Sequence, residues 1–127
     1  MTYYISKTID TTFEDAIEQT TTALKEKGFG VLTTIDVKKT MKEKIDAEIR
    51  PYTILGACNP NFAYQALLQE PKIGTMLPCN VIVEAVEGGI EVSAVDPMAS
   101  MQAVENENLA GIAQEVQTLL REVIQSL

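Results

Sequence analysis

The strongest constraint on the fold is the periodicity of apolar side chains in residues 109–127. Apolar residues recur there at i, i+3, i+4 and i+7, which predicts an α-helix with one wide apolar face. The apolar positions are Leu109, Ile112, Ala113, Val116, Leu119, Leu120, Val123, Ile124 and Leu127. A helix of about five turns with such a face needs a broad apolar surface to pack on, and a sheet provides one.

Short runs rich in β-branched and aromatic residues predict the strands of that sheet. Gly88-Gly89 is expected to join the last two strands as a tight hairpin, and Pro97 stops the final strand. We expect strands at residues 2–9, 29–37, 52–58, 79–87 and 90–96. The chain is therefore predicted to be an α+β protein, with a single, largely antiparallel sheet and helices packed on it.

Helix signals separate the predicted strands. Thr11 and Glu14 have the spacing of a capping box, and Gly28 suits the left-handed residue that closes such a helix. Residues 36–49 predict a short amphipathic helix or a helical connector. A further helix is expected over residues 61–69, followed by a loop that leads into the next strand.

Charge restricts the partners of this chain. Ten Lys and Arg stand against 18 Asp and Glu, a net charge of −8, and residues 73–127 hold only Arg121 against eight carboxylates. Such a surface repels nucleic acids and anionic membranes, so neither is an expected partner. The one basic cluster is interleaved with acidic residues, which predicts a solvated helix face. It consists of Lys38, Lys39, Lys42 and Lys44.

The chain has no histidine. A Ser-His-Asp or Cys-His catalytic pair and a His-ligated metal are therefore excluded within one subunit. Dinucleotide-binding, phosphate-loop, EF-hand and nucleophile-elbow motifs are missing too. The sequence therefore argues against an enzyme but leaves one open, since Asp, Glu, Tyr, Lys or a thiol could do acid–base work, and the cofactor is unknown. The length predicts one domain over residues 1–127, and the lack of a membrane-spanning stretch or signal peptide predicts a cytoplasmic protein with free thiols.

The two cysteines occupy similar settings. Cys58 is expected where a strand gives way to a helix, with Asn59 as N-cap and Pro60 at the first helical position. Free backbone N–H groups and the helix dipole can lower the pKa of a thiol there. Cys79 is expected to begin the next strand. If the two strands are antiparallel neighbours with directly opposed cysteines, Cα atoms about 4.5–5.5 Å apart would satisfy disulfide geometry.

Several roles for these cysteines remain open. Both could be buried packing residues, a reactive or redox-active pair with Cys58 as the more activated sulfur, or part of a ligand-binding site. A soft metal such as Cu(I) could be held with the help of Met76. Asn59 and Asn80 could be caps and turn formers, or amide donors to a carbonyl or carboxylate ligand. The candidate binding or redox residues are Cys58, Asn59, Pro60, Pro78, Cys79 and Asn80.

The cysteine motifs belong to a pattern that extends along almost the whole chain. Its parts are Gly28-Phe29, Ile35-Asp36-Val37, the stretch YTILGACNP from Tyr52 to Pro60, Ala63, Ala66-Leu67, Gly74, Leu77-Pro78-Cys79-Asn80-Val81 and Asp96-Pro97. This pattern resembles a bacterial and archaeal family, Domain of Unknown Function 302. The resemblance implies an α+β fold similar to the TATA-binding-protein-like arrangement, with a long C-terminal helix, and it implies a homodimer. The family has no established reaction, so the motif residues carry over without roles.

Two hypotheses of different class follow. In the first, the protein is a small binding or sensing module with a cleft lined by the cysteine motifs, with a small-molecule ligand and thiol–disulfide or soft-metal chemistry as options. In the second, it is a structural or protein-interaction domain in which both cysteines are buried packing residues.

Overall fold

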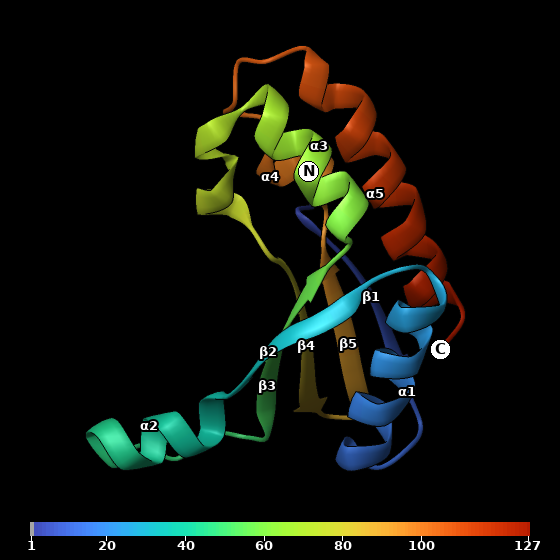
Figure 1. Ribbon diagram of the computed structural model, residues 1–127. Coiled ribbons are helices and arrows are strands. Elements are labelled where there is room, and N and C mark those ends of the chain that lie inside the picture. Colours follow the sequence, from blue (N-terminus) through green and yellow to red (C-terminus); the bar gives the residue numbers. More distant parts are fainter. Residues whose placement is uncertain (1) are drawn as a thin grey trace.

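The computed structural model describes residues 2–127 (Figure 1). Over these residues the chain forms one five-stranded sheet in the order β1-β5-β4-β3-β2, and all neighbouring strands are antiparallel. The strands are β1 (Tyr4–Ile9), β2 (Gly30–Asp36), β3 (Tyr52–Cys58), β4 (Cys79–Val86) and β5 (Gly89–Val95). The helices are α1 (Phe13–Glu26), α2 (Val37–Ile45), α3 (Pro60–Gln69), the 3-10 helix η1 (Pro71–Met76), α4 (Pro97–Ser100) and α5 (Asn108–Gln125).

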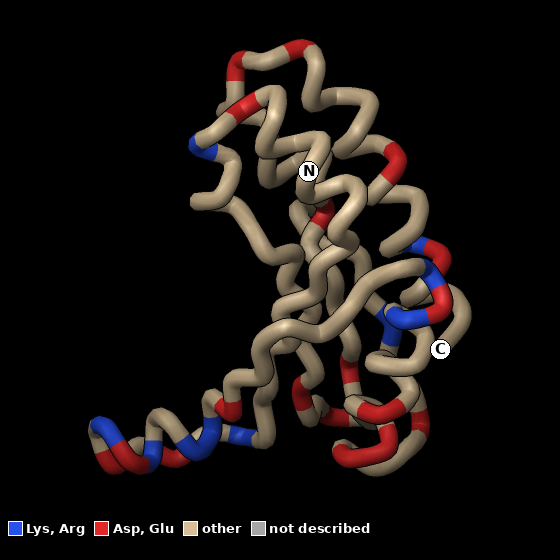
Figure 2. The backbone as a smooth tube through the Cα atoms, viewed as in Figure 1, with Lys and Arg blue, Asp and Glu red and all other residues tan. Residues whose placement is uncertain are grey.

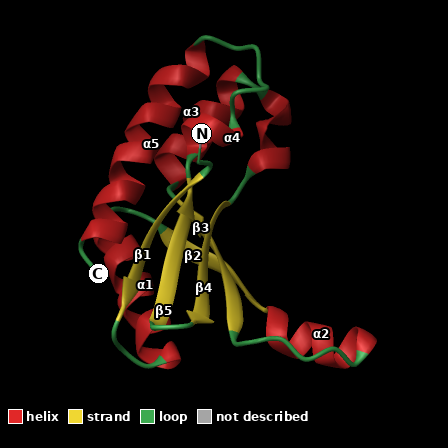
Figure 3. Ribbon diagram, turned by 180° about the vertical axis from the view of Figure 1, so that it is seen from behind, coloured by secondary structure: helices red, strands yellow, loops and turns green. Residues whose placement is uncertain are grey.

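Helices α1 and α5 pack on the same face of the sheet, where they contact β1, β4 and β5 (Figure 1). Helices α3 and α4 and the 3-10 helix η1 gather beyond the end of the sheet where β3 finishes and β4 begins (Figure 3). Helix α2 projects away from the other helices at the opposite end. This arrangement is the α+β fold that the sequence predicts, with a single antiparallel sheet, helices packed on it and a long C-terminal helix.

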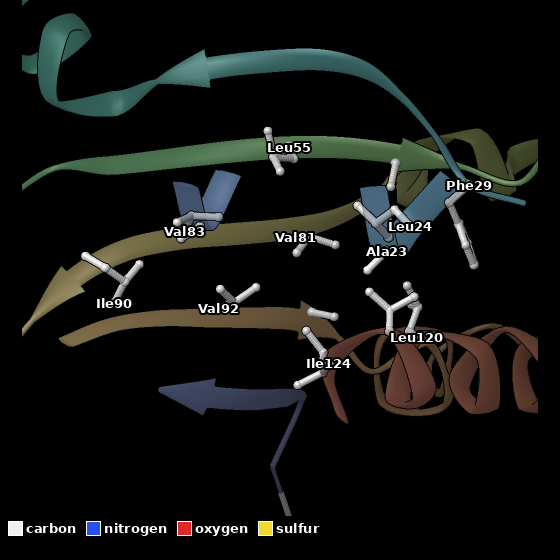
Figure 4. Close-up of a cluster of buried hydrophobic side chains, with 14 of the residues drawn as sticks. Ala23, Leu24, Phe29, Leu55, Val81, Val83, Ile90, Val92, Leu120 and Ile124 are labelled. Atoms are coloured by element: carbon white, nitrogen blue, oxygen red, sulfur yellow. The ribbon is translucent and has the colours of Figure 1, made fainter. Parts of the chain in front are cut away.

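The core lies between the sheet and helices α1 and α5 (Figure 4). The strands contribute Leu55, Val81, Val83 and Val92 from alternate positions, because successive side chains of a strand point to opposite faces. Each such side chain, when fully buried, stabilises the fold by about 1.5–3 kcal/mol. The buried residues of α5 all belong to the predicted apolar stripe; they are Leu109, Ala113, Val116, Leu120, Val123 and Ile124.

On the other face of the sheet, no helix of residues 2–127 covers the middle, as the rear view shows (Figure 3). We call it the open face. In register across β4 and β5 it presents Glu84 opposite Glu91 and Ile82 opposite Ser93. Ile54 of β3 lies directly opposite Ile82 on the same face.

Two predicted turns and caps are shifted by one residue. The N-cap of α1 is Thr12, whose hydroxyl accepts a hydrogen bond from the Asp15 N–H at 3.1 Å, and Thr11 does not play this role. Both threonines can cap, but Thr12 has the extended backbone conformation that an N-cap needs. The hairpin turn is Glu87-Gly88 and not Gly88-Gly89, because Gly89 already pairs with Val86.

The region expected as a short helix or connector forms α2, which has no buried residue. Lys42 forms ion pairs with Asp46 at 2.6 Å and with Glu48 at 3.0 Å. The basic cluster is therefore a solvated helix face, as predicted. Among residues 2–127, none of the helices combines the length and the apolar content required to cross a bilayer.

Candidate functional site

Cys58 ends β3 and Cys79 begins β4, as the sequence predicts. These strands are antiparallel neighbours, but the Cα partner of Cys79 is Ala57, whereas Cys58 pairs with Gly30 of β2. The prediction of directly opposed cysteines is therefore wrong by one residue. Both cysteines are free thiols. A one-residue offset matters because it normally turns two side chains toward opposite faces of a sheet.

Asn59 organises the passage from β3 into α3. It is the N-cap, and its side-chain oxygen accepts a hydrogen bond from the Phe62 N–H at 3.5 Å, while Pro60 occupies the first turn. The Asn59 amide also lies over Gly28, where a Cβ would come within 3.1 Å of its nitrogen. Gly28 has a φ of +86°, so glycine is favoured there both by backbone conformation and by space.

Pro78 packs against the backbone of β3 on the other side of the motif. A Cβ at Gly56 would lie 2.8 Å from Cγ of Pro78 and 2.2 Å from Oγ1 of Thr33, so no larger residue fits without displacing its neighbours. The Leu77–Pro78 peptide bond is cis. Pro78 of one cysteine motif thus packs against the strand that leads into the other motif, while Asn59 packs over the turn at Gly28.

Both cysteines line one cavity, which we call the cysteine cavity, between the end of the sheet and helices α3 and α5. Cys58 reaches it because it is the last residue of β3, where the chain turns into α3. The cavity has a volume of about 30 Å³, and its lining is almost entirely apolar. Besides the motif residues, it is lined by Phe29, Ala57, Phe62, Ala63, Ala66, Leu77, Met101, Ile112, Ala113 and Val116.

The apolar surroundings determine the charge state of Cys79. Burial, and to a smaller extent the nearby Cys58, raise the pKa of the Cys79 thiol to about 11, against an ordinary value of 9.0. Burial acts in this direction because the thiolate loses hydration that the neutral thiol needs less. Cys79 is therefore a neutral thiol at physiological pH.

Comparison with known proteins places the chain in a family. The family model described as "Domain of unknown function DUF302" matches residues 5–127. The chain belongs to this family. A similar solved structure is the crystal structure of the uncharacterized conserved protein DUF302 from Bacillus stearothermophilus, with 26% sequence identity, a TM-score of 0.92 and 98% of each chain covered. A search of the curated proteins found no significant match.

In this DUF302 chain, four of the six candidate site residues line the cysteine cavity: Cys58, Asn59, Pro78 and Cys79. Pro60 is exposed on the first turn of α3 and does not line the cavity. Asn80 lies on the open face, because it follows Cys79 in the strand and successive side chains alternate. The expectation of one cleft holding both Asn59 and Asn80 is thus not met.

Met76, the weak candidate for a soft-metal ligand, is exposed at the end of η1 and does not line the cavity. The methionine that does so is Met101, from the segment between α4 and α5. Within residues 2–127 no group of three or more His, Cys, Asp or Glu side chains is arranged to hold a metal ion.

Sequence reasoning missed several cavity residues, and the available signals differ among them. Ile112, Ala113 and Val116 belong to the apolar stripe of α5, so their burial was predictable but their position beside the cysteines was not. Phe62 follows the Asn59 cap by three residues and could have been inferred from the geometry of the first turn of α3. Met101 has no local signal.

Proposed function

We propose that this DUF302 protein is a small binding module, that its site is the cysteine cavity, and that it takes up a compact apolar group beside the Cys58 thiol. The observation that carries the proposal is that residues of two motifs, 58–59 and 77–79, line a single apolar cavity with a partly exposed cysteine. Small-molecule sites are mostly apolar with a few polar groups that fix orientation, and Cys58 and Asn59 supply such groups here.

The size and polarity of the cavity define the ligand class. Its free space of about 30 Å³ suits the end of a hydrocarbon chain or another group of a few atoms. A charged group would lose its hydration in this lining without a partner. Thiol–disulfide and soft-metal chemistry are less well supported, because both use thiolates and the pKa of Cys79 is raised to about 11.

Xenon is a suitable probe, because it is compact and binds apolar cavities. We expect dissolved xenon to shift the methyl NMR signals of Leu77, Ile112 and Val116, but not that of Leu55, which lies elsewhere in the core. Ala63→Leu should abolish the shifts by filling the cavity.

Ala110→Leu is the matched control, since Ala110 is exposed on the same long helix that lines the cavity. Shifts that are absent in the wild-type protein, or that persist unchanged in Ala63→Leu, would contradict the binding proposal. They would favour the alternative function, in which the cysteines are packing residues of an interaction domain.

We also propose that residues 1–127 form one domain, that the protein is cytoplasmic and that it forms a homodimer. The homodimer is supported by large apolar side chains that are exposed on the outer side of α3, namely Tyr64, Leu67 and Leu68. Sedimentation equilibrium over a range of protein concentrations measures this assembly directly, and a monomer mass throughout would refute it.

A further inference from the structure

A groove much larger than the cysteine cavity lies on the open face. It has a volume of about 460 Å³ and runs along β4 and β5, next to the N-terminal residues and the start of β3. We call it the open-face groove. Its polar lining consists of Asn80, Glu84, Glu91 and Ser93, and its aromatic lining is formed by tyrosines. This volume falls within the range of small-molecule sites.

Two carboxylates face each other in the groove. Glu84 and Glu91 are directly opposed on adjacent antiparallel strands, and both are half-buried. Within residues 2–127 neither forms an ion pair with Lys or Arg. Partial burial, the charge of Glu91 and a hydrogen bond of the protonated Glu84 carboxyl with the Glu91 side chain raise the pKa of Glu84, although Arg50 acts in the opposite sense. Like charges opposed across a strand pair destabilise a sheet, so this arrangement favours a bound cation.

Tyrosine rings flank the carboxylates. Tyr52 is directly opposed to Glu84 across β3 and β4, while Tyr3 and Tyr4 approach from the N-terminal side in an edge-on pair with centroids 5.1 Å apart. Partial burial, Glu84 and Tyr3 all raise the pKa of Tyr52, so its hydroxyl stays protonated and can donate a hydrogen bond. Aromatic faces attract cations, and Tyr3 is freely available because 69% of it is exposed.

Ser93 gives an independent indication of a ligand. Only 6% of this residue is exposed, it points into the groove, and in the described part of the chain its hydroxyl has no hydrogen-bond partner. None of the fully enclosed side-chain oxygens or nitrogens of residues 2–127 lacks a partner, so the Ser93 hydroxyl must open onto the groove. A ligand there can satisfy a polar group that would otherwise be nearly buried and unpaired.

We propose that the open-face groove binds an organic ammonium group, with the cation between Glu84 and Glu91 and its alkyl chain against the tyrosine rings. An anion would be repelled by this carboxylate pair, and further acidic residues lie around the same end of the sheet, where the lysines of α2 are interleaved with acidic residues (Figure 2). A divalent metal ion is a poorer match, because no third acidic or sulfur ligand joins the pair in the described residues. The ammonium could belong to a free amine or to a lysine side chain of another polypeptide.

The test uses the ¹⁵N-labelled full chain and three probes of similar length. These are 1,5-diaminopentane, Nα-acetyl-lysine methylamide and the uncharged 1,5-pentanediol. We expect the amines to shift the backbone NMR signals of Glu84, Glu91 and Ser93 with saturation, and the diol not to. Added salt should weaken amine binding. Saturation by diaminopentane alone identifies a free amine, and saturation by the lysine compound identifies a protein side chain; either result supports the site.

The variant Glu84→Gln/Glu91→Gln should lower amine affinity at least about tenfold, because it removes both carboxylates that contact the cation. Glu105→Gln/Glu115→Gln is the matched control, with the same change of net charge at two exposed sites outside the groove. The proposal is overturned if the diol shifts the same signals, if both double variants lose equal affinity, or if neither amine shifts these signals. The first and third outcomes need only the wild-type protein, so they decide the question even if a variant does not fold.

Discussion

The cysteine cavity and the open-face groove share strand β4 but have opposite character. The cavity is small and apolar, with a volume of about 30 Å³, whereas the groove is large, aromatic and acidic, with about 460 Å³. The neighbouring residues Cys79 and Asn80 divide between them, one on each side of β4. A single sequence motif can therefore serve the core with one residue and a surface site with the next.

The two regions also differ in what their residues contribute to stability. Side chains around the cavity are continuous with the hydrophobic core, so they stabilise the fold whether or not a ligand binds. Some side chains around the groove, such as Tyr3, are largely exposed, and opposed carboxylates cost stability there. Substitutions in the two regions should consequently have effects of different size and different sign.

The largest expected effect is that of Phe29→Ala at the cavity. Phe29 is 2% exposed, and removing a buried aromatic ring should lower the free energy of unfolding by about 3–5 kcal/mol. Tyr3→Ala in the groove should change it by no more than about 0.5 kcal/mol, since 69% of Tyr3 is exposed. Urea unfolding of the two variants measures both values, and similar losses in the two would refute the distinction between core cavity and free surface.

Cys79 should make the stability of the protein depend on alkaline pH. Its pKa is about 11 in the folded protein and near 9.0 when solvated, so the folded state retains the proton over this interval while the unfolded state loses it. The stabilisation from the neutral thiol is complete below pH 9 and is lost as the pH rises toward 11, by about 2–3 kcal/mol in total.

Cys79→Ala should remove this part of the alkaline destabilisation. Urea unfolding at several pH values from 8 to 10.5 would show the stability of the wild-type protein converging on that of the variant. Cys58→Ala is the control. It should keep the alkaline destabilisation, because it leaves Cys79 buried and burial is the larger cause of the raised pKa of Cys79. Parallel pH curves for the wild-type protein and Cys79→Ala would mean that Cys79 is solvated, and hence that the cavity is open to water.

Much of the fold could be predicted because its signals are local. The period of α5 follows from the spacing of apolar residues, and the N-cap at Asn59 and the positive φ of Gly28 follow from residue type and position. The pairing register is not local. It depends on which residues of β3 and β4 meet. The sequence predicted Cys58 as the partner of Cys79, whereas the observed partner is Ala57, one residue earlier.

The sites were harder to predict than the fold for the same reason. Cys58 and Cys79 were recognisable from their motifs, but the groove also contains Tyr3 and Tyr52, which lie far in sequence from Glu84 and Glu91. Glu84 in a strand suggests only solvent exposure until β5 places Glu91 opposite it. The residues that carry the stronger binding-site chemistry became visible only through the topology of the sheet.

The smallest expected effect is a gain of stability from Glu84→Gln. The pKa of Glu84 is raised by partial burial and by Glu91, so the folded state disfavours its ionised form and loses stability as the pH rises through the titration of this group. At pH 7 the variant should be more stable than the wild-type protein by about 0.2–1 kcal/mol, because it relieves the repulsion across β4 and β5. At about pH 3, where the Glu84 carboxyl with its raised pKa is protonated, the gain should vanish.

Unfolding curves at pH 7 and pH 3 measure this gain, with the exposed Glu115→Gln as a control whose effect should not follow the same pH dependence. Adding 1,5-diaminopentane at pH 7 should then narrow the gap, since the amine stabilises the wild-type protein more than the variant. A loss of stability in Glu84→Gln at pH 7 would contradict this account. It would mean that the Glu84 carboxylate already has a stabilising partner in the protein, in which case the groove would have no need of a cation.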